Sequence, residues 1–218
     1  MKRVIFISGL GANEMAFSNI GELSYKKVMV KWIPVTQEDT LLSYTERLIS
    51  IYSISNNDIL VGLSFGGLIS QKISALLGNK LLILVSSFRS KEDLKLLFRL
   101  PLTLGIHKLM PTFKIPIIDS IVARVLNGGN KDSIPVLNKM LQSTDYKLMK
   151  WSLDSIDKAE SVDLSETVVY LLIGDKDLIV KTWKADNRTI LKGGSHFAVY
   201  DQGVYMTELI KDIIRRDN

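Results

Sequence analysis

Residues 58–69 read DILVGLSFGGLI: an apolar run, a G-x-S-x-G pattern at residues 62–66, and the start of a segment with helical spacing. Between a strand and a helix, this pattern predicts a nucleophile elbow, a sharp turn that holds Ser64 in a strained conformation at its tip. Glycines at positions 62 and 66 would let the strand and the helix approach closely. The alternative is an ordinary glycine-rich turn with no chemical role. The flanking segments favour the elbow, and therefore a serine nucleophile.

A serine hydroxyl needs a base to become a strong nucleophile. The chain contains only two histidines, His107 and His196. His196 lies in a glycine-rich loop between the last predicted strand and the final predicted helix. His107 lies in a proline-punctuated segment, where a histidine is more often a surface or packing residue. We therefore predict that His196 is the base.

Two carboxylates, Asp175 and Asp177, follow an apolar run that ends at Gly174. A carboxylate beside the base fixes its tautomer and stabilises the imidazolium. We predict that Asp177 is this acid and that Asp175 shapes the turn through its side chain. The alternative, that either residue is only a solvated turn residue, stays open. The order Ser64, Asp177, His196 is one of the chain orders known for serine hydrolases.

The oxyanion that forms when a serine attacks a carbonyl needs hydrogen-bond donors. We predict that the backbone N–H of Phe65, directly after the nucleophile, is one donor. The loop after the first predicted strand, Ser8-Gly9-Leu10-Gly11, would supply the N–H of Leu10 as the second donor. A plain turn is the alternative for this loop.

Short apolar runs alternate with helical stretches along most of the chain. Strands are predicted at residues 3–8, 28–34, 59–63, 80–85 and 168–174 and, more weakly, at 188–191. Helices are predicted at residues 14–23, 40–52, 65–77 and 200–216. Continuous runs of Val, Ile and Leu are typical of strands buried on both faces. The alternation predicts an α/β fold with a doubly wound, mostly parallel sheet of about six strands.

The alternation breaks between about residues 88 and 161, which contain no convincing strand. Helical pieces are separated there by Pro101, Pro111, Pro116 and Pro135. We interpret this segment as an insertion within a single domain of residues 1–218, because it begins after one core strand and ends before the next. Ligands in open α/β sheets bind beyond the carboxyl ends of the strands. A helical insertion at that edge would cover the site as a cap or lid.

The net charge of +5 lies in one segment of the chain. Residues 88–131 carry eight Lys or Arg and three Asp or Glu, whereas the other residues are balanced. This excess indicates either a solvated helical surface or attraction for an anionic substrate, carrier or membrane surface. The segment lacks a recognisable nucleic-acid-binding module and is poor in aromatic residues, so we expect no nucleic-acid partner.

The chain has no cysteine. Disulfides, thiolate metal sites and a cysteine nucleophile are thereby excluded, and the composition fits a reducing compartment, so we expect a cytoplasmic location. The apolar run at residues 4–7 is not followed by a long h-region or a cleavage site. No uncharged run approaches the roughly 18 residues of a membrane span, so we expect no stable membrane insertion. We expect no metal and no cofactor, and the oligomeric state is not readable.

These features resemble the α/β-hydrolase superfamily, in particular small bacterial serine hydrolases with a helical cap. Five elements agree in order: the oxyanion loop at 8–11, the elbow at 62–66, the cap at about 88–161, the acid at 175–177 and the His loop at 193–197. The segment at 174–180 is similar to the G-x-x-D motif of the superfamily, which places Asp177 on its acid. Ser8 stands where the family often has a histidine. The first antiparallel hairpin of the family has no counterpart, so the resemblance implies about six core strands instead of eight.

These residues together predict hydrolysis of a carboxylic ester or thioester through an acyl-enzyme on Ser64. The leucine-rich insertion suggests an apolar cap over an acyl chain, and simple packing of its helices explains the leucines equally well. Its basic residues would suit a thioester on an anionic carrier. Alternatives are acyl transfer, C–C bond cleavage or a lyase reaction on the same fold, or a non-catalytic ligand-binding module. A serine at the elbow argues against dehalogenation and epoxide hydrolysis, which need a carboxylate there.

Overall fold

The central element of the fold is one sheet of six parallel strands. The computed structural model describes residues 2–109, 116–128 and 130–217. The strands are β1 (Arg3–Ile7), β2 (Lys26–Val30), β3 (Ile59–Leu63), β4 (Leu81–Val85), β5 (Val168–Gly174) and β6 (Asn187–Leu191). They pair in the order β2-β1-β3-β4-β5-β6, and every pairing is parallel. The predicted doubly wound sheet of about six strands is confirmed.

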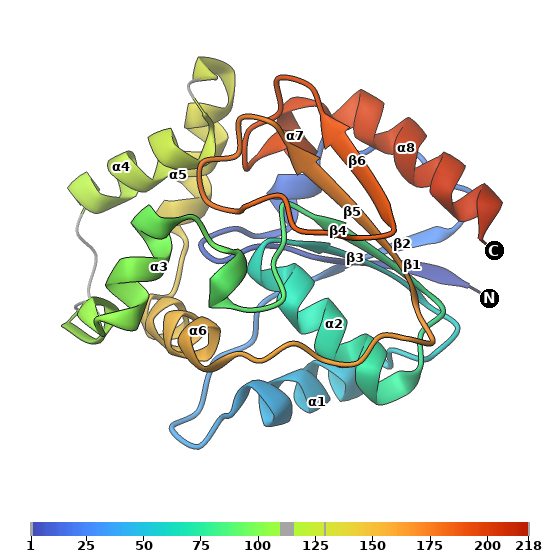
Figure 1. Ribbon diagram of the computed structural model, residues 1–218, viewed down its shortest axis with the longest axis horizontal. Coiled ribbons are helices and arrows are strands. Elements are labelled where there is room, and N and C mark those ends of the chain that lie inside the picture. The colour runs from blue at the N-terminus through green and yellow to red at the C-terminus, as the bar shows by residue number, and fades with distance from the viewer. Residues whose placement is uncertain (1, 110–115, 129, 218) are drawn as a thin grey trace.

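Helices cover both faces of the sheet and one of its ends. The α-helices are α1 (Leu41–Tyr52), α2 (Phe65–Leu77), α3 (Leu96–Thr103), α4 (Pro116–Leu126), α5 (Ile134–Gln142), α6 (Tyr146–Lys158), α7 (Ala198–Asp201) and α8 (Gly203–Arg216). The 3₁₀ turns are η1 (Glu14–Phe17), η2 (Lys91–Asp93), η3 (Ile106–Leu109) and η4 (Lys131–Ser133). Figure 1 shows α1 and α2 on one side of the sheet and α8 on the other. Helices α3–α6 gather at the end of the sheet that lies away from the two termini (Figure 1).

Between β4 and β5, the described residues form helices joined by loops and turns, and none belongs to a strand of the sheet. This segment contains α3–α6. Within the described residues, one isolated β-bridge joins it to another part of the chain, between Leu94 and Val180. We call residues 88–161 the helical insertion. One predicted breaker there, Pro111, lies outside the described residues, whereas Pro101 lies inside α3 and Pro116 begins α4.

The helix predicted at residues 14–23 is wrong beyond Phe17. Only the 3₁₀ turn η1 forms, with the Asn13 side chain accepting from the backbone N–H of Met15 at 3.0 Å. Phe17 is buried against Phe6, with ring centroids 5.1 Å apart. The polar residues that follow compete with helical hydrogen bonds, and Gly21 is a poor helix former, so the helix does not continue.

Two other predicted boundaries differ from the structure. The strand predicted at residues 28–34 begins at Lys26 and ends at Val30, at the edge of the sheet. After Val30 the chain leaves the sheet and turns toward the loop after β1. The indole N–H of Trp32 donates to the Ala12 carbonyl at 3.0 Å in that turn. The helix predicted at residues 200–216 is divided at Gln202 into α7 and α8.

The sheet separates two hydrophobic cores. Alternate strand residues face the two sides: Ile5 and Leu60 pack with α1 and α2, whereas Phe6 and Val61 pack with α8. All four side chains are fully buried. Burial of each such side chain stabilises the fold by about 1.5–3 kcal/mol. This two-sided burial explains the continuous apolar runs in the sequence.

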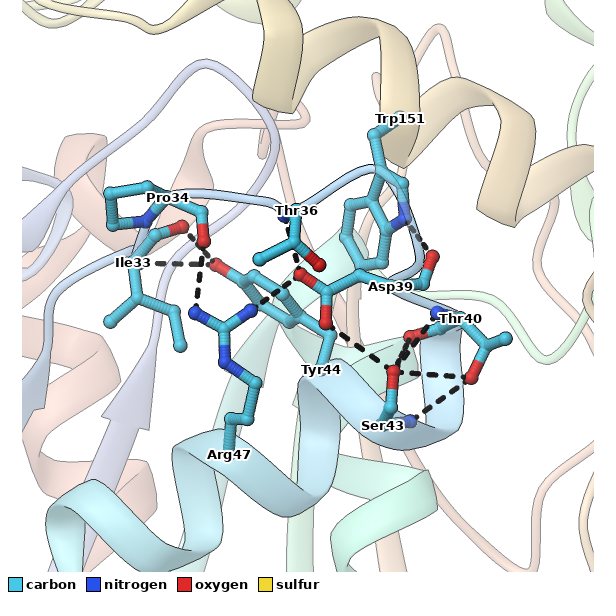
Figure 2. Close-up of polar contacts among 9 residues, drawn as sticks. All are labelled: Ile33, Pro34, Thr36, Asp39, Thr40, Ser43, Tyr44, Arg47 and Trp151. Carbon is cyan, nitrogen blue, oxygen red and sulfur yellow. Dashed lines mark hydrogen bonds and ion pairs between the residues drawn. The ribbon is translucent and has the colours of Figure 1, made fainter.

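An aromatic contact fastens the helical insertion to the body of the domain. The indole of Trp151 on α6 donates to the main-chain carbonyl of Asp39 at 2.8 Å and packs on Tyr44, with centroids 4.6 Å apart. Figure 2 shows this contact beside the ion pair of Asp39 with Arg47. Trp151 also meets Phe65 edge to face, with centroids 6.1 Å apart. The insertion is therefore fixed directly beside the residue that follows Ser64.

Candidate active site

Ser64 forms the strained turn between β3 and α2. Its backbone has φ 51° and ψ −119°, a region that a residue with a side chain rarely adopts. The Ser64 N–H donates to the Val85 carbonyl at 2.9 Å, and the Ser87 hydroxyl donates to the Ser64 carbonyl at 2.8 Å. These bonds from the neighbouring strand end hold a conformation that would otherwise cost free energy.

Steric crowding explains both glycines of the G-x-S-x-G pattern. A Cβ atom at Gly62 would lie 2.4 Å from the Cα of Gly67. A Cβ atom at Gly66 would lie 2.2 Å from the main-chain oxygen of Ile7. Both neighbours are backbone atoms of the central strands and of the helix start, so they cannot move aside. The close approach predicted from the sequence is present at both positions.

His196 lies between the serine and a carboxylate. Its Nε2 is 2.9 Å from Ser64 Oγ, and its Nδ1 is 2.9 Å from Asp177 Oδ2. An ionised carboxylate only accepts hydrogen bonds, so Nδ1 carries the proton. Nε2 then has a free lone pair that accepts from the Ser64 hydroxyl. This arrangement lets His196 take the proton when Ser64 attacks an electrophile.

Asp177 is buried, with 1% of its surface exposed, and its second oxygen is also engaged. Oδ1 accepts from the backbone N–H groups of Ile179 at 2.8 Å and Val180 at 3.0 Å. Burial alone would raise the pKa of Asp177, but His196 and these N–H groups together lower the pKa below its ordinary value. The carboxylate is therefore ionised beside the imidazole at neutral pH.

Asp175 takes a different place. Its Oδ1 accepts from the backbone N–H of Gly193 at 2.8 Å, and the side chain is exposed. It joins the turn after β5 to the loop that carries His196. The structure thus brings Asp177 to the imidazole and leaves Asp175 as a turn residue.

The loop after β1 has Ser8 where the resemblance to the superfamily would place a histidine. Hydrogen bonds within the loop hold it in place instead. Ser8 is buried, and its hydroxyl donates to the Ala12 carbonyl at 3.1 Å. The Ala12 N–H donates in turn to the Gly9 carbonyl at 3.1 Å. The loop passes against the nucleophile, since a Cβ atom at Gly9 would lie 3.1 Å from Ser64 Cβ.

The two predicted oxyanion donors lie at this junction. Leu10 and Phe65 line the same cavity as Ser64. Within the described residues, neither backbone N–H donates to another group of the protein. Phe65 is also the first residue of α2, where an N–H has no partner within the helix. Both N–H groups therefore lie beside Ser64 without a partner among the described residues.

A cavity of about 720 Å³ opens in front of Ser64. It lies between the body and the helical insertion. Among the lining residues that the structure describes, the polar side chains are those of Ser64, His196 and His107. The apolar lining comes mainly from the insertion: Phe88, Leu94, Leu97, Phe98, Pro101, Leu102, Ile106, Leu109, Val122, Leu126, Leu137, Leu141, Met149, Leu153 and Ile156. Such a cavity suits an apolar ligand with one polar group at Ser64.

His107 forms its own pair in the helical insertion. Its ring is buried, and its Nε2 is 2.9 Å from Asp154 Oδ1 on α6. Among the residues that the structure describes, its buried Nδ1 has no hydrogen-bond partner. The structure therefore places His107 as a packing residue of the insertion that touches the cavity, outside the hydrogen-bonded chain at Ser64.

Two contacts near the site were not predicted. The Lys95 ammonium donates to the main-chain carbonyl of Asp177, and the Lys95 N–H donates to the Ile179 carbonyl at 2.8 Å. The Ser195 hydroxyl donates to Asp201 at 3.0 Å, and burial raises the pKa of this carboxyl group. Lys95 and Asp177 are 82 residues apart, so no local pattern could have joined them.

Across the described ranges, no cluster of three or more His, Asp or Glu side chains could hold a metal ion. No helix in the same ranges is long and apolar enough to cross a membrane.

Comparisons with solved structures establish the fold. A thermophilic esterase from Thermogutta terrifontis superposes with a TM-score of 0.77 at 14% identity, covering 99% of this chain and 90% of that one. A hydrolase from Oleispira antarctica gives 0.74 at 13% identity, with 99% and 91% covered. A meta-cleavage product hydrolase from Pseudomonas fluorescens gives 0.72 at 11% identity, with 100% and 92% covered. The chain has the α/β-hydrolase fold, as its resemblance to that superfamily implied.

No protein-family model matches the sequence, and no curated protein is significantly similar to it.

Proposed function

We propose that this chain is a serine hydrolase that cleaves a carboxylic ester or thioester through an acyl-enzyme on Ser64. One observation carries the proposal: Ser64, His196 and Asp177 form a continuous hydrogen-bonded chain with two 2.9 Å links. The serine is held in a strained turn at the floor of an apolar cavity. An activated hydroxyl with donors beside it is what acyl transfer to a serine requires.

Each residue of the site has its own role in the proposed reaction. Ser64 Oγ bonds to the carbonyl carbon while its proton passes to His196 Nε2, and Asp177 stabilises the imidazolium that forms. The N–H groups of Leu10 and Phe65 donate to the oxyanion. When the intermediate collapses, the bond to the leaving group breaks and His196 gives that group its proton. Water then attacks the acyl carbon while its proton passes to His196, the bond from that carbon to Ser64 Oγ breaks, and His196 returns the proton to Ser64 as the acid leaves.

The cavity supports an apolar acyl group as the substrate. Most of its described lining residues are apolar residues of the helical insertion, chiefly leucine, isoleucine and phenylalanine. We propose that residues 88–161 act as a cap over the bound acyl chain, and that the chain works in the cytoplasm, which its lack of cysteine supports. The superposed structures named as an esterase and as hydrolases are precedents for such chemistry on this fold.

The proposal is tested with p-nitrophenyl esters and acyl thioesters of increasing chain length, comparing the wild type with Ser64→Ala. We expect hydrolysis that increases with acyl length and is abolished in Ser64→Ala. Trapping the quenched enzyme for intact mass should reveal an added acyl group. Product appearing as an ester when an alcohol is added would indicate acyl transfer. Binding of the esters without turnover, or turnover that survives in Ser64→Ala, would contradict the proposal.

A further inference from the structure

Exposed apolar residues of one segment lie beside the cavity. We define the apolar collar as Leu96, Leu97, Leu100, Leu104, Ile106 and Leu109, on α3 and η3. Their exposed fractions range from 49% to 85%. They make up six of the fourteen exposed large hydrophobic residues in the part of the chain that the structure describes. Scattered apolar residues are normal on a surface, but a contiguous set indicates an interaction site.

The apolar collar is continuous with the cavity of Ser64. Leu97, Ile106 and Leu109 line the cavity and are also 75%, 51% and 85% exposed. An apolar molecule can therefore move from the outer surface to the serine without leaving apolar contact. For a substrate that arrives dissolved in water, exposed leucines at the entrance only add unfavourable hydration. For a substrate dissolved in lipid, the same leucines remove the aqueous gap between the lipid and the cavity.

The charges on the apolar collar have one sign. Residues 94–109 contain Lys95, Arg99 and Lys108 and no Asp or Glu. Asp154 and Asp157 on the neighbouring α6 are already paired, with His107 and with a lysine of the insertion. Lys108 is exposed beside Leu109, and Arg99 is half-buried on α3, so two cations lie among the leucines, with Glu92 near Arg99 and Asp157 near Lys108. Exposed leucines on short helices together with Lys and Arg are typical of surfaces that lie on anionic lipid.

We propose that the apolar collar docks peripherally on an anionic phospholipid surface, from which the substrate enters the cavity. This inference rests on the proposed function for the fate of the substrate, whereas the docking itself does not. A second copy of the chain would repeat the same positive charge across the contact, and an acidic carrier protein would leave the leucines in water. Anionic lipid satisfies both the leucines and the cations.

Binding is tested by cosedimentation of the full chain with vesicles of phosphatidylcholine alone and of phosphatidylcholine mixed with phosphatidylglycerol. The collar variant is Leu96→Ser, Leu100→Ser and Leu104→Ser together, since these three residues do not line the cavity. The matched control is Val204→Ser with Tyr205→Ser, which are 81% and 52% exposed on α8. Circular dichroism and urea unfolding confirm that each variant is folded.

We expect the wild type and the α8 control to bind the mixed vesicles, and the collar variant to bind them at least about tenfold more weakly. Replacing Arg99 and Lys108 by glutamine should remove the preference for mixed over neutral vesicles. The collar variant should hydrolyse a water-soluble ester like the wild type. Ser64→Ala should bind vesicles normally, so loss of docking and loss of hydrolysis are distinguishable.

Four outcomes would overturn the inference. The first is no binding to either kind of vesicle, and the second is equal binding by the wild type and the collar variant. The third is a dimer in sedimentation velocity that disappears in the collar variant while vesicle binding is absent, which would assign the collar to a second copy of the chain. Capture of an acidic carrier protein, with no vesicle binding, would likewise replace lipid by protein as the partner.

Discussion

Two histidine–aspartate pairs lie beside the same cavity, and they are built in opposite ways. In both pairs the imidazole is buried and lies 2.9 Å from its carboxylate. His196 uses Nδ1 for Asp177, so its Nε2 meets Ser64. His107 uses Nε2 for Asp154, and its Nδ1 meets no hydrogen-bond partner in the described part of the chain. The two histidines differ in the ring nitrogen that does not face the carboxylate. In His196 this nitrogen reaches Ser64, as a candidate base must, whereas in His107 it does not.

The two carboxylates also differ. The side chain of Asp177 is 1% exposed and accepts two backbone N–H groups besides the imidazole, whereas that of Asp154 is 33% exposed. Three buried donors hold Asp177 in one orientation, while water reaches Asp154. The comparison shows that a buried imidazole beside a carboxylate is not sufficient for this chemistry. A nucleophile fixed by a strained turn must also lie within reach.

The largest expected effect separates the two histidines. His196→Ala should lower kcat/KM for an ester by a factor on the order of 10⁴–10⁶, because the base for Ser64 is lost. His107→Ala should lower it by less than about tenfold, since this change removes only packing at the cavity wall. Steady-state kinetics on one ester measure both. A larger loss in His107→Ala than in His196→Ala would reverse the assignment.

The next effect separates the carboxylates. Asp177→Asn should lower kcat by a factor on the order of 10⁴, because the tautomer of His196 is no longer fixed. Asp154→Asn and Asp175→Asn are the controls, and each should change kcat by less than about threefold. Each of the three variants replaces one carboxylate oxygen with an NH₂ group of similar size. Comparable losses in Asp175→Asn and Asp177→Asn would show that the acid has been misassigned.

A smaller effect concerns the lysine that supports the loop carrying Asp177. Lys95→Met should lower the free energy of unfolding by about 1–3 kcal/mol, since a charged hydrogen bond to the Asp177 carbonyl is lost. Lys181→Met is a matched control. That lysine donates to the Glu92 carbonyl from an exposed position, and its loss should cost less than about 0.5 kcal/mol. Urea unfolding measures both, and equal losses would contradict the special role of Lys95.

The smallest effect is a pH dependence of stability. The pKa of Asp177 is lowered in the folded protein, so its contribution to stability is complete above the ordinary carboxyl pKa and is lost as the pH falls through the lowered value. The free energy of unfolding of the wild type should therefore fall relative to Asp177→Asn as the pH is reduced below the ordinary pKa of 3.8. Urea unfolding at a series of acidic pH values tests this sign. A difference that grows toward low pH would contradict it.

Local sequence patterns were sufficient for the elements that depend on neighbours in the chain. The run from Asp58 into α2 predicted both the strand and the turn at Ser64, because the apolar run and the two glycines act over a few residues. The parallel sheet followed from continuous apolar strands. Asp177 and His196 could be placed at one sheet edge because each follows a strand end.

Contacts between distant segments could not be predicted in this way. The pairing of His107 with Asp154 depends on how α6 packs against η3, and the bond from Lys95 depends on the segment at 92–95 lying beside the segment at 177–181. Helix periodicity contains no information on any of these contacts.

Labelling the purified protein with a fluorophosphonate, and mapping the adduct by peptide mass spectrometry, tests directly whether Ser64 is activated. We expect one adduct, on Ser64. Labelling should be absent in Ser64→Ala, strongly reduced in His196→Ala and close to normal in His107→Ala. A folded wild-type protein that is not labelled, or a label that persists in Ser64→Ala, would contradict the claim that His196 and Asp177 activate this serine.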